Sequence, residues 1–241
     1  MIEYKVRSLS EYLDLIERAK RLEETNGNKA DFIYRGQRSE ETLRPKLARI
    51  VRRGNRRDRE KLMFAEFQRT CASLTALQPT NEWDFLALAQ HHGLPTRLLD
   101  WTYSALAGLW FAIERPLEIE GKAQDVFVWL LKTHFDDFID ERSRQSPFEG
   151  GATRIYRPRL ITPRIAAQAG IFTLHRIQPN GAVVSIERNK RFKHRLIRFR
   201  ISGRNIPQIR EHLHGCGVNE FTLFPDLVGL CRHLGWRYTK S

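Results

Sequence analysis

The stretch from Ala87 to Glu114, ALAQHHGLPTRLLDWTYSALAGLWFAIE, constrains the fold of this chain more than any other. The capping-type Asn81 and the later Gly93 predict a helix over 81–92, because such residues are typical at the start and just past the end of helices. A second helix is predicted over 104–114, which carries almost no charge and should be buried. Ionisable groups between two buried helices need partners or water. We therefore expect the polar loop between the helices to belong to a functional site.

The composition favours one domain of the α+β class. The chain has 241 residues, of which 41% are hydrophobic, enough to form a core. Helical and strand patterns are mixed without a regular alternation, so we expect mixed central sheets flanked by helices. Residues 1–30 are expected to form an N-terminal helical segment that packs on a domain formed by residues 31–241.

The pattern of apolar residues predicts several further elements. Ser8 and Glu11 have the spacing of a capping box before a helical period. A helix is expected over 58–77, and a mobile basic loop over 39–57. Strands are predicted over 125–131, 182–186 and 195–201, and the last of these should have one core face and one basic face.

The sequence gives no sign of a membrane segment or a metal site. No apolar run approaches the roughly 20 residues that cross a bilayer. The N-terminus lacks an apolar signal stretch, so we expect a cytoplasmic protein with no membrane partner. Cys71, Cys216 and Cys231 are widely spaced, which predicts neither a disulfide framework nor a zinc site.

The formal net charge of +13 favours a polyanionic partner. Positive charge is concentrated in segments 44–61 and 188–200, and in the second it alternates with apolar and aromatic residues. This pattern is typical of a surface that follows a phosphate backbone, although a solvated basic face is the alternative. The residues expected to contact nucleic acid are Arg52, Arg53, Arg56, Arg57, Arg191, Lys193, Arg195, Arg198 and Arg200.

A short strand is predicted from Asp31 to Gly36, with Arg35 at its end in the motif Tyr34-Arg35-Gly36-Gln37. Arginine is suited to bidentate binding of phosphate or carboxylate, and a glycine lets a ligand approach the backbone closely. The alternative is a structural arginine that pairs with a core carboxylate such as Asp100.

Other polar residues allow less specific interpretations. His91 and His92 point in different directions on a helix, so we expect them to cap or orient the segment rather than share a metal ion. Ser104, His92 and Asp100 could form a hydrolytic triad, but no Gly-x-Ser-x-Gly elbow accompanies them. Glu220 lies in an apolar segment, where an acid is usually paired or has a perturbed pKa; the alternative is an exposed glutamate on an edge strand.

Several of these motifs together resemble the FRG domain, a bacterial and phage family named for a Phe-Arg-Gly motif. Tyr34-Arg35-Gly36 has tyrosine in the first position, and the string from His92 to Thr102 is the family's most distinctive one. Further matches are Ser104-Ala105, Phe111-Ala112, Arg164-Ile165, Gln168, Gly170 to Thr173, Leu223 to Leu227 and Gly229-Leu230. By this resemblance, residues 31–241 are identified as an FRG domain.

FRG motifs are in turn similar to those of ADP-ribosyltransferases, which implies a split central sheet. By this resemblance, Arg35 corresponds to the arginine that anchors the phosphates of NAD. Asp100-Trp101-Thr102 takes the place of a Ser-Thr-Ser strand, followed by a helix over 104–112. Glu220 corresponds to a late glutamate that stabilises the oxocarbenium-like transition state, although the usual Glu or Gln two positions earlier is missing.

The resemblance implies an NAD-dependent mono-ADP-ribosyltransferase, as a toxin or antiphage effector that modifies RNA or DNA. NAD would be the substrate, no metal would be needed, and an antitoxin protein could be a partner. The catalytic residues would be Glu220 and Arg35. NAD would be bound by Arg35, Gly36, Gln37, His92, Thr96, Asp100, Trp101, Thr102 and Tyr103. The alternatives are a non-catalytic nucleic-acid-binding module and, less favoured, a metal-independent nuclease or hydrolase that uses His92 and Asp100.

Overall fold

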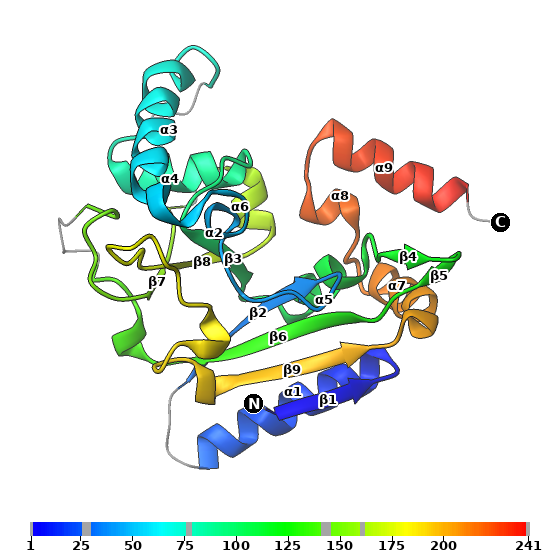
Figure 1. The fold of residues 1–241 in the computed structure, drawn as a ribbon. Coiled ribbons are helices and arrows are strands. Elements are labelled where there is room, and N and C mark those ends of the chain that lie inside the picture. The colour runs from blue at the N-terminus through cyan, green and yellow to red at the C-terminus, as the bar shows by residue number, and fades with distance from the viewer. Residues whose placement is uncertain (1, 26–29, 76–78, 141–145, 160–161, 240–241) are drawn as a thin grey trace.

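The structure, a computed structural model, describes residues 2–25, 30–75, 79–140, 146–159 and 162–239. Within these residues, seven strands form one sheet (Figure 1). In spatial order they are β1 (Ile2–Val6), β9 (Leu196–Ile201), β6 (Val126–Thr133), β2 (Asp31–Gln37), β3 (Leu98–Thr102), β8 (Gly170–Leu174) and β7 (Arg154–Tyr156). β1 runs parallel to β9, and the other neighbouring strands are antiparallel. The predicted α+β class is confirmed.

The sheet is almost divided between β2 and β3. β2 pairs with β6 over seven positions, and β3 pairs with β8 over five. In the described part of the chain, a single pair, Tyr34 with Thr102, joins β2 to β3. We call the place where the two strands separate beyond this pair the β2–β3 notch.

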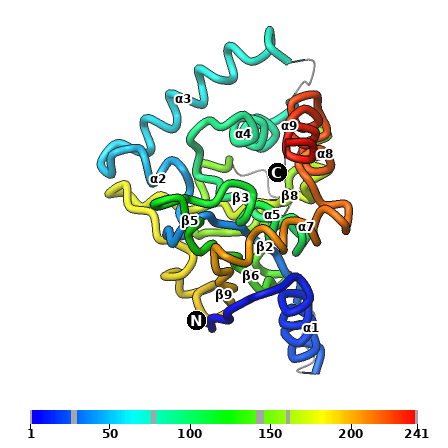
Figure 2. The backbone as a smooth tube through the Cα atoms, turned by 90° about the vertical axis from the view of Figure 1, so that its right-hand side faces the viewer, coloured from blue at the N-terminus to red at the C-terminus, as the bar shows by residue number. Residues whose placement is uncertain are grey.

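Helices cover the sheet unevenly. One face of β9, β6 and β2 shares a core with α1 (Leu9–Thr25), α5 (Ala105–Ile113), α7 (Ile206–Gly215) and α8 (Glu220–Leu223). The opposite face is covered by Leu43, Ile186 and Phe192, which come from segments outside the α-helices and strands. α3 (Arg56–Cys71) and α4 (Glu82–His91) pack on β3 and β8. α1 and α3 lie at opposite ends of the molecule (Figures 1 and 2).

The remaining elements are short apart from the last helix. They are α2 (Lys46–Ile50), α6 (Pro163–Ala167), α9 (Leu227–Tyr238) and a small hairpin of β4 (Glu118–Ile119) and β5 (Lys122–Ala123). Among the helices that the structure describes, none is long and apolar enough to span a membrane.

The two helices predicted around the central stretch are confirmed as α4 and α5. The Asn81 side chain accepts a hydrogen bond from the N–H of Asp84, and the Ser104 side chain accepts one from the N–H of Ala107. The prediction of a loop throughout the segment between them is wrong, because residues 98–102 form β3. This strand is buried at every position except Asp100.

Two other local predictions are wrong. The segment 39–57 is not a mobile loop, because it contains α2 and its Leu43 and Leu47 are fully buried. The strand predicted over 182–186 is reduced to one isolated bridge between Ile177 and Val183. The predicted helix over 58–77 is observed as α3, but it ends at Cys71; residues 72–75 are not helical, and the predicted end lies outside the described residues.

Gly36 lets β2 contact the backbone of α5 directly. A Cβ atom at Gly36 would lie 2.3 Å from the backbone N of Ala112 and 2.4 Å from the carbonyl O of Gly108. A Cβ at Gly108 would in turn lie 2.7 Å from the Cβ of Tyr34. Both distances at Gly36 are far below van der Waals contact, so helix and strand approach this closely only because both positions are glycine.

We therefore expect Gly36→Ala to lower the free energy of unfolding by about 3 kcal/mol or more, because the added methyl overpacks the contact with α5. Gly54→Ala is the matched control, since no atom lies within 4 Å of a Cβ at Gly54. The control should change stability by less than about 0.5 kcal/mol. Denaturant titrations of both variants measure the difference, and equal effects would contradict this account.

Candidate functional site

A cleft of about 440 Å³ opens at the β2–β3 notch. It is lined by parts of β2, β3, β8, α2, α4, α5 and α6. Among the described residues, its charged lining groups are the cations Arg35, Lys46, Arg49 and Arg164 and the acids Asp100 and Glu114. The excess of positive charge favours an anionic ligand.

Arg35 bridges the notch. Its Nη1 donates a hydrogen bond to the carbonyl O of Asp100 at 2.6 Å and lies 3.9 Å from the carboxylate Oδ2 of the same residue. Its Nε is buried and has no hydrogen-bond partner in the described part of the chain. Burial lowers the pKa of Arg35, but an arginine in a protein stays protonated. Arg35 therefore contacts Asp100, as expected if the arginine has a structural role. Its Nε–H remains available as a hydrogen-bond donor to a ligand.

Asp100 is fixed from α4. Its carboxylate accepts hydrogen bonds of 2.9 and 3.1 Å from the Nε2 of Gln90. The Oε1 of Gln90 accepts a hydrogen bond of 2.6 Å from the hydroxyl of Thr96, which in turn accepts one from the N–H of Leu98. Thr96 is buried and lies behind the cleft lining. This chain of polar contacts connects the end of α4 to β3.

Glu114, at the C-terminal end of α5, is a cleft carboxylate that the sequence analysis missed. Burial raises the pKa of the Glu114 carboxyl; Arg115 opposes this shift and Glu220 adds to it. A signal was present in the sequence, because Glu114 is the only charged residue in the predicted helix 104–114.

Glu220 lies behind Glu114 rather than in the cleft lining. It is the first residue of α8, and its side chain is 15% exposed. Its Oε1 lies 3.5 Å from Arg115 Nη2 and 3.3 Å from Arg232 Nη1. It lines a separate small hollow with Arg210. The structure thus brings Arg35 and Thr102 to one cleft and places Glu220 in an adjoining one.

Trp101 and Thr102 line the cleft with side chains that are already engaged. The indole of Trp101 is buried, and its Nε1 donates to the hydroxyl of Thr173 at 3.1 Å. The Thr102 hydroxyl donates to the carbonyl of Gln168 at 2.6 Å and accepts from the N–H of Ser104 at 2.9 Å. Both residues shape the floor of the cleft.

Three further predicted ligand-binding residues lie outside the cleft lining. Gln37 accepts a hydrogen bond of 2.7 Å from the indole of Trp129. The hydroxyl of Tyr103 accepts one of 2.8 Å from Arg157. His92 is exposed at the end of α4.

His91, the neighbour of His92, lines the cleft instead. Burial lowers the pKa of His91 to about 4, and the nearby Arg164 and His92 contribute to the shift. The imidazole of His91 is therefore neutral at pH 7.

Arg97, at the centre of the string from His92 to Thr102, has a structural role. Its guanidinium forms a buried ion pair with Glu60 of α3, with Nη2 2.5 Å from Oε2 and both side chains at most 3% exposed. It also lies over the ring of Phe148, 4.9 Å from the ring centroid. A buried pair of this kind is strongly destabilising to break, which ties α3 to the start of β3.

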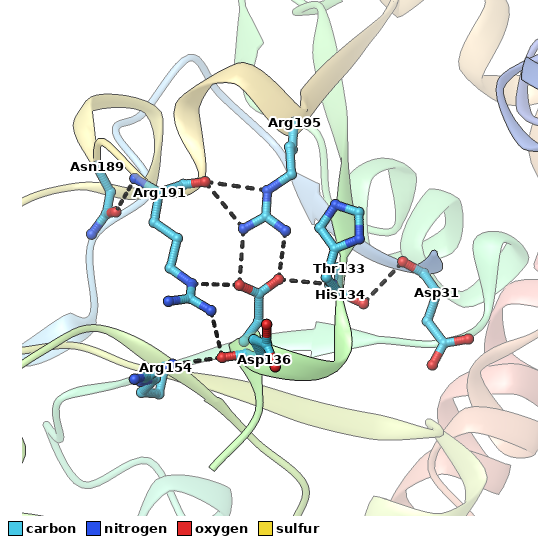
Figure 3. A network of polar contacts seen from close by, with 9 residues as sticks. Asp31, Thr133, His134, Asp136, Arg154, Asn189, Arg191 and Arg195 are labelled. Atoms are coloured by element: carbon cyan, nitrogen blue, oxygen red, sulfur yellow. Dashed lines mark hydrogen bonds and ion pairs between the residues drawn. The ribbon is translucent and has the colours of Figure 1, made fainter. Parts of the chain in front are cut away.

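The arginines near the start of β9 are held by an acidic centre. Asp137 is almost fully buried and accepts hydrogen bonds from Arg195 at 2.6 and 2.9 Å and from Arg191 at 2.5 Å. Its carboxylate also accepts one from the N–H of His134. Arg191 additionally contacts the carbonyl of Asp136 (Figure 3). These two arginines are therefore held by contacts within the protein, although one carboxylate offsets the charge of only one of them.

Other residues of the predicted nucleic-acid surface are also engaged. Arg198 forms ion pairs with Glu3 and Glu40, and Arg200 with Asp125. Arg56 donates to the carbonyls of residues 48, 51 and 181. The predicted residues that remain exposed without a side-chain ion pair among the described residues are Arg52, Arg53, Arg57 and Lys193.

In the described ranges, no group of three or more His, Cys, Asp or Glu side chains is placed to hold a metal ion.

Comparison with known protein families gives a match, which covers part of the cleft lining. The model of the FRG domain family matches residues 30–120 of the chain. This range includes Arg35, Asp100 and Glu114 of the cleft. Comparisons with curated proteins and with solved structures give no match.

Acidification should lower the free energy of unfolding, because two histidines have a lowered pKa in the folded protein. Burial holds the pKa of both His91 and the fully buried His175 at about 4, below the value of 6.5 in an unfolded chain. Between these pH values the unfolded state binds protons that the folded state does not, so the free energy of unfolding falls as the pH drops from about 6.5 towards 4. Denaturant titrations at pH 7 and pH 5 measure this fall.

His91→Gln provides the comparison, because His91 is only half-buried and its loss leaves the core intact. The variant should lose less stability than the wild type between pH 7 and pH 5. An identical loss in both proteins would show that His91 does not remain neutral in the folded state.

Proposed function

We propose that this protein is an NAD-dependent mono-ADP-ribosyltransferase that reacts in the cleft at the β2–β3 notch. The observation that carries the proposal is the Arg35 guanidinium, which lines the cleft and has a buried, unpartnered Nε among the described residues. A buried donor without a partner is costly unless a ligand satisfies it. The resemblance of the surrounding motifs to those of ADP-ribosyltransferases supports a dinucleotide as that ligand.

The diphosphate of NAD would be held between Arg35 and Arg164. Arg164 also lines the cleft, and its Nε is likewise buried without a partner in the described residues. Its guanidinium lies over the ring of Phe224, 4.2 Å from the centroid, which fixes its position. Lys46 adds positive charge from α2, where the neighbouring Arg49 is ion-paired with Glu41 at 2.9 Å. Two forked guanidinium groups suit a pair of phosphates.

A carboxylate would stabilise the transition state. The bond between ribose C1′ and the nicotinamide nitrogen breaks, and its electron pair leaves with nicotinamide. An acceptor hydroxyl or amine then forms a bond to C1′ and gives its proton to the carboxylate or to water. We assign the carboxylate role in the cleft to Glu114, which lines it and whose pKa is raised by burial and, to a smaller extent, by the neighbouring Glu220.

RNA or DNA is the proposed acceptor, supported by the net charge of +13 and the exposed arginines of the segment 52–57. As a toxin or antiphage effector, the protein would modify nucleic acid in the cell that makes it. An antitoxin protein would then be needed to hold the activity in check.

The test is nicotinamide release from NAD by the full chain, with RNA and DNA present as acceptors. Glu114→Gln should lower turnover by roughly 100-fold, because the charge that stabilises the oxocarbenium-like state is lost. Arg35→Lys should weaken NAD binding by about tenfold or more, because a lysine cannot replace a forked guanidinium. Glu220→Gln, measured beside them, decides between the two glutamates: a larger loss than in Glu114→Gln would move the catalytic role to Glu220.

Glu24→Gln and Arg21→Lys are the matched controls, since both residues are exposed on α1. They should keep full turnover. A wild-type protein that binds RNA or DNA but leaves NAD intact would overturn the proposal and favour a non-catalytic nucleic-acid-binding module.

A further inference from the structure

A second charged hollow lies away from the cleft, where β1 and β9 end. It has a volume of about 310 Å³ and is lined by the cations Lys5, Arg7, Arg200 and Arg204, beside Asp125. Lys5 and Arg200 are register neighbours on the parallel strands β1 and β9, so their side chains emerge from the same face of the sheet. Arg204 comes from the 3-10 turn Gly203–Asn205 that precedes α7. We call this feature the basic hollow.

The basic hollow is held in shape by Asp125. Its Oδ2 accepts a hydrogen bond of 2.7 Å from Arg200 Nε, and its Oδ1 accepts one of 3.2 Å from the N–H of Gly203. Gly203 also packs against β5, because a Cβ there would lie 1.8 Å from the carbonyl O of Ala123. One acid thus fixes both Arg200 and the turn that carries Arg204.

The positive charge of the basic hollow exceeds what its acid can neutralise. Four cations face one carboxylate, and that carboxylate is paired with Arg200. Among the residues that the structure describes, the side chains of Lys5, Arg7 and Arg204 form no ion pair. The hollow therefore differs from the neighbouring segment 188–198, whose arginines Arg191, Arg195 and Arg198 are ion-paired.

We propose that the basic hollow binds the sugar-phosphate backbone of RNA or DNA. Cations from separate elements surround a concave site, which suits successive phosphates of one strand. Three of them have donors free for a ligand, and the fourth is pre-oriented by Asp125. A polyanion also fits the net charge of the chain better than a single small anion does.

The basic hollow is separate from the cleft but lies near it. Arg200 on β9 is opposite Phe127 on β6, which is opposite Gln37 on β2, two residues beyond Arg35. At the usual spacing of strands and residues, the backbones of Arg200 and Arg35 are roughly 12 Å apart. A strand bound in the hollow would thus lie near the reacting ribose. This role for the hollow in presenting the acceptor rests on the proposed function, whereas binding itself can be measured without NAD.

The test is fluorescence anisotropy with a labelled 20-nucleotide RNA, the same sequence as single-stranded DNA, and the DNA duplex, in several salt concentrations. The triple variant Lys5→Gln, Arg7→Gln and Arg204→Gln should weaken binding by roughly tenfold or more. It should also reduce the slope of log affinity against log salt by about 2 to 3, one for each lost phosphate contact. Comparison of the affinities for the RNA, the single-stranded DNA and the duplex shows which nucleic acid is preferred.

The matched control removes the same three charges from α1, as Arg18→Gln, Lys20→Gln and Arg21→Gln, all at exposed positions. It should bind within about twofold of the wild type. Equal weakening by the two triple variants would show a diffuse charge effect and overturn the proposal. Binding to phosphatidylserine vesicles without binding to any of the nucleic acids would overturn it as well.

Because the site variant leaves the cleft untouched, the two proposals can fail separately. Loss of nucleic-acid binding with normal NAD turnover on a small acceptor would support the basic hollow and leave the cleft chemistry standing. Nucleic-acid binding that depends on the hollow in a protein inert towards NAD would support the hollow and refute the transferase.

Discussion

The close contact between β2 and α5 is the constraint on which the site depends. Gly36 and Gly108 remove the side chains that would otherwise hold the strand and the helix apart. The helix is capped by Ser104, two residues after β3 ends, so the contact also fixes β3 relative to β2. Arg35 precedes Gly36 and points to the opposite face of the strand, so the packing of its neighbour determines where its guanidinium lies.

The cleft exists because the sheet is nearly divided between β2 and β3. Strands that paired fully would satisfy each other's backbone groups and leave no room for a ligand. Here one pair joins β2 to β3 among the described residues, and the Arg35 side chain contacts the carbonyl of Asp100 across the notch. A buried cation with a free donor is costly in an empty site, and this cost is recovered when an anion binds. Arg191 and Arg195 differ from Arg35 because their guanidinium groups are already paired with the Asp137 carboxylate.

Local signals in the sequence were enough for the elements around the site. Asn81, Gly93 and Ser104 act within one helical turn, so both flanking helices were predictable. Arg35 was predicted at the end of a strand, but β2 continues past it to Gln37. The pairing of residues that are distant in the sequence was not predictable from these local signals. The acid that holds Arg195 lies 58 residues away, and the Glu3 that holds Arg198 lies 195 residues away. For the same reason the basic hollow could not be foreseen, because its cations come from opposite ends of the chain.

The most direct test of the account follows the arginine Nε–H signals by NMR while ADP-ribose is added. The Nε–H of Arg35, which has no acceptor among the described residues, should shift in a saturable way as it gains a phosphate acceptor. The Nε–H of Arg97, which already donates to Glu60 in the core, serves as the internal reference and should stay unchanged. A saturable shift confined to Arg35 and its cleft neighbours is the predicted result. An Arg35 signal that does not move at saturating ADP-ribose would contradict the assignment of the notch as a diphosphate site.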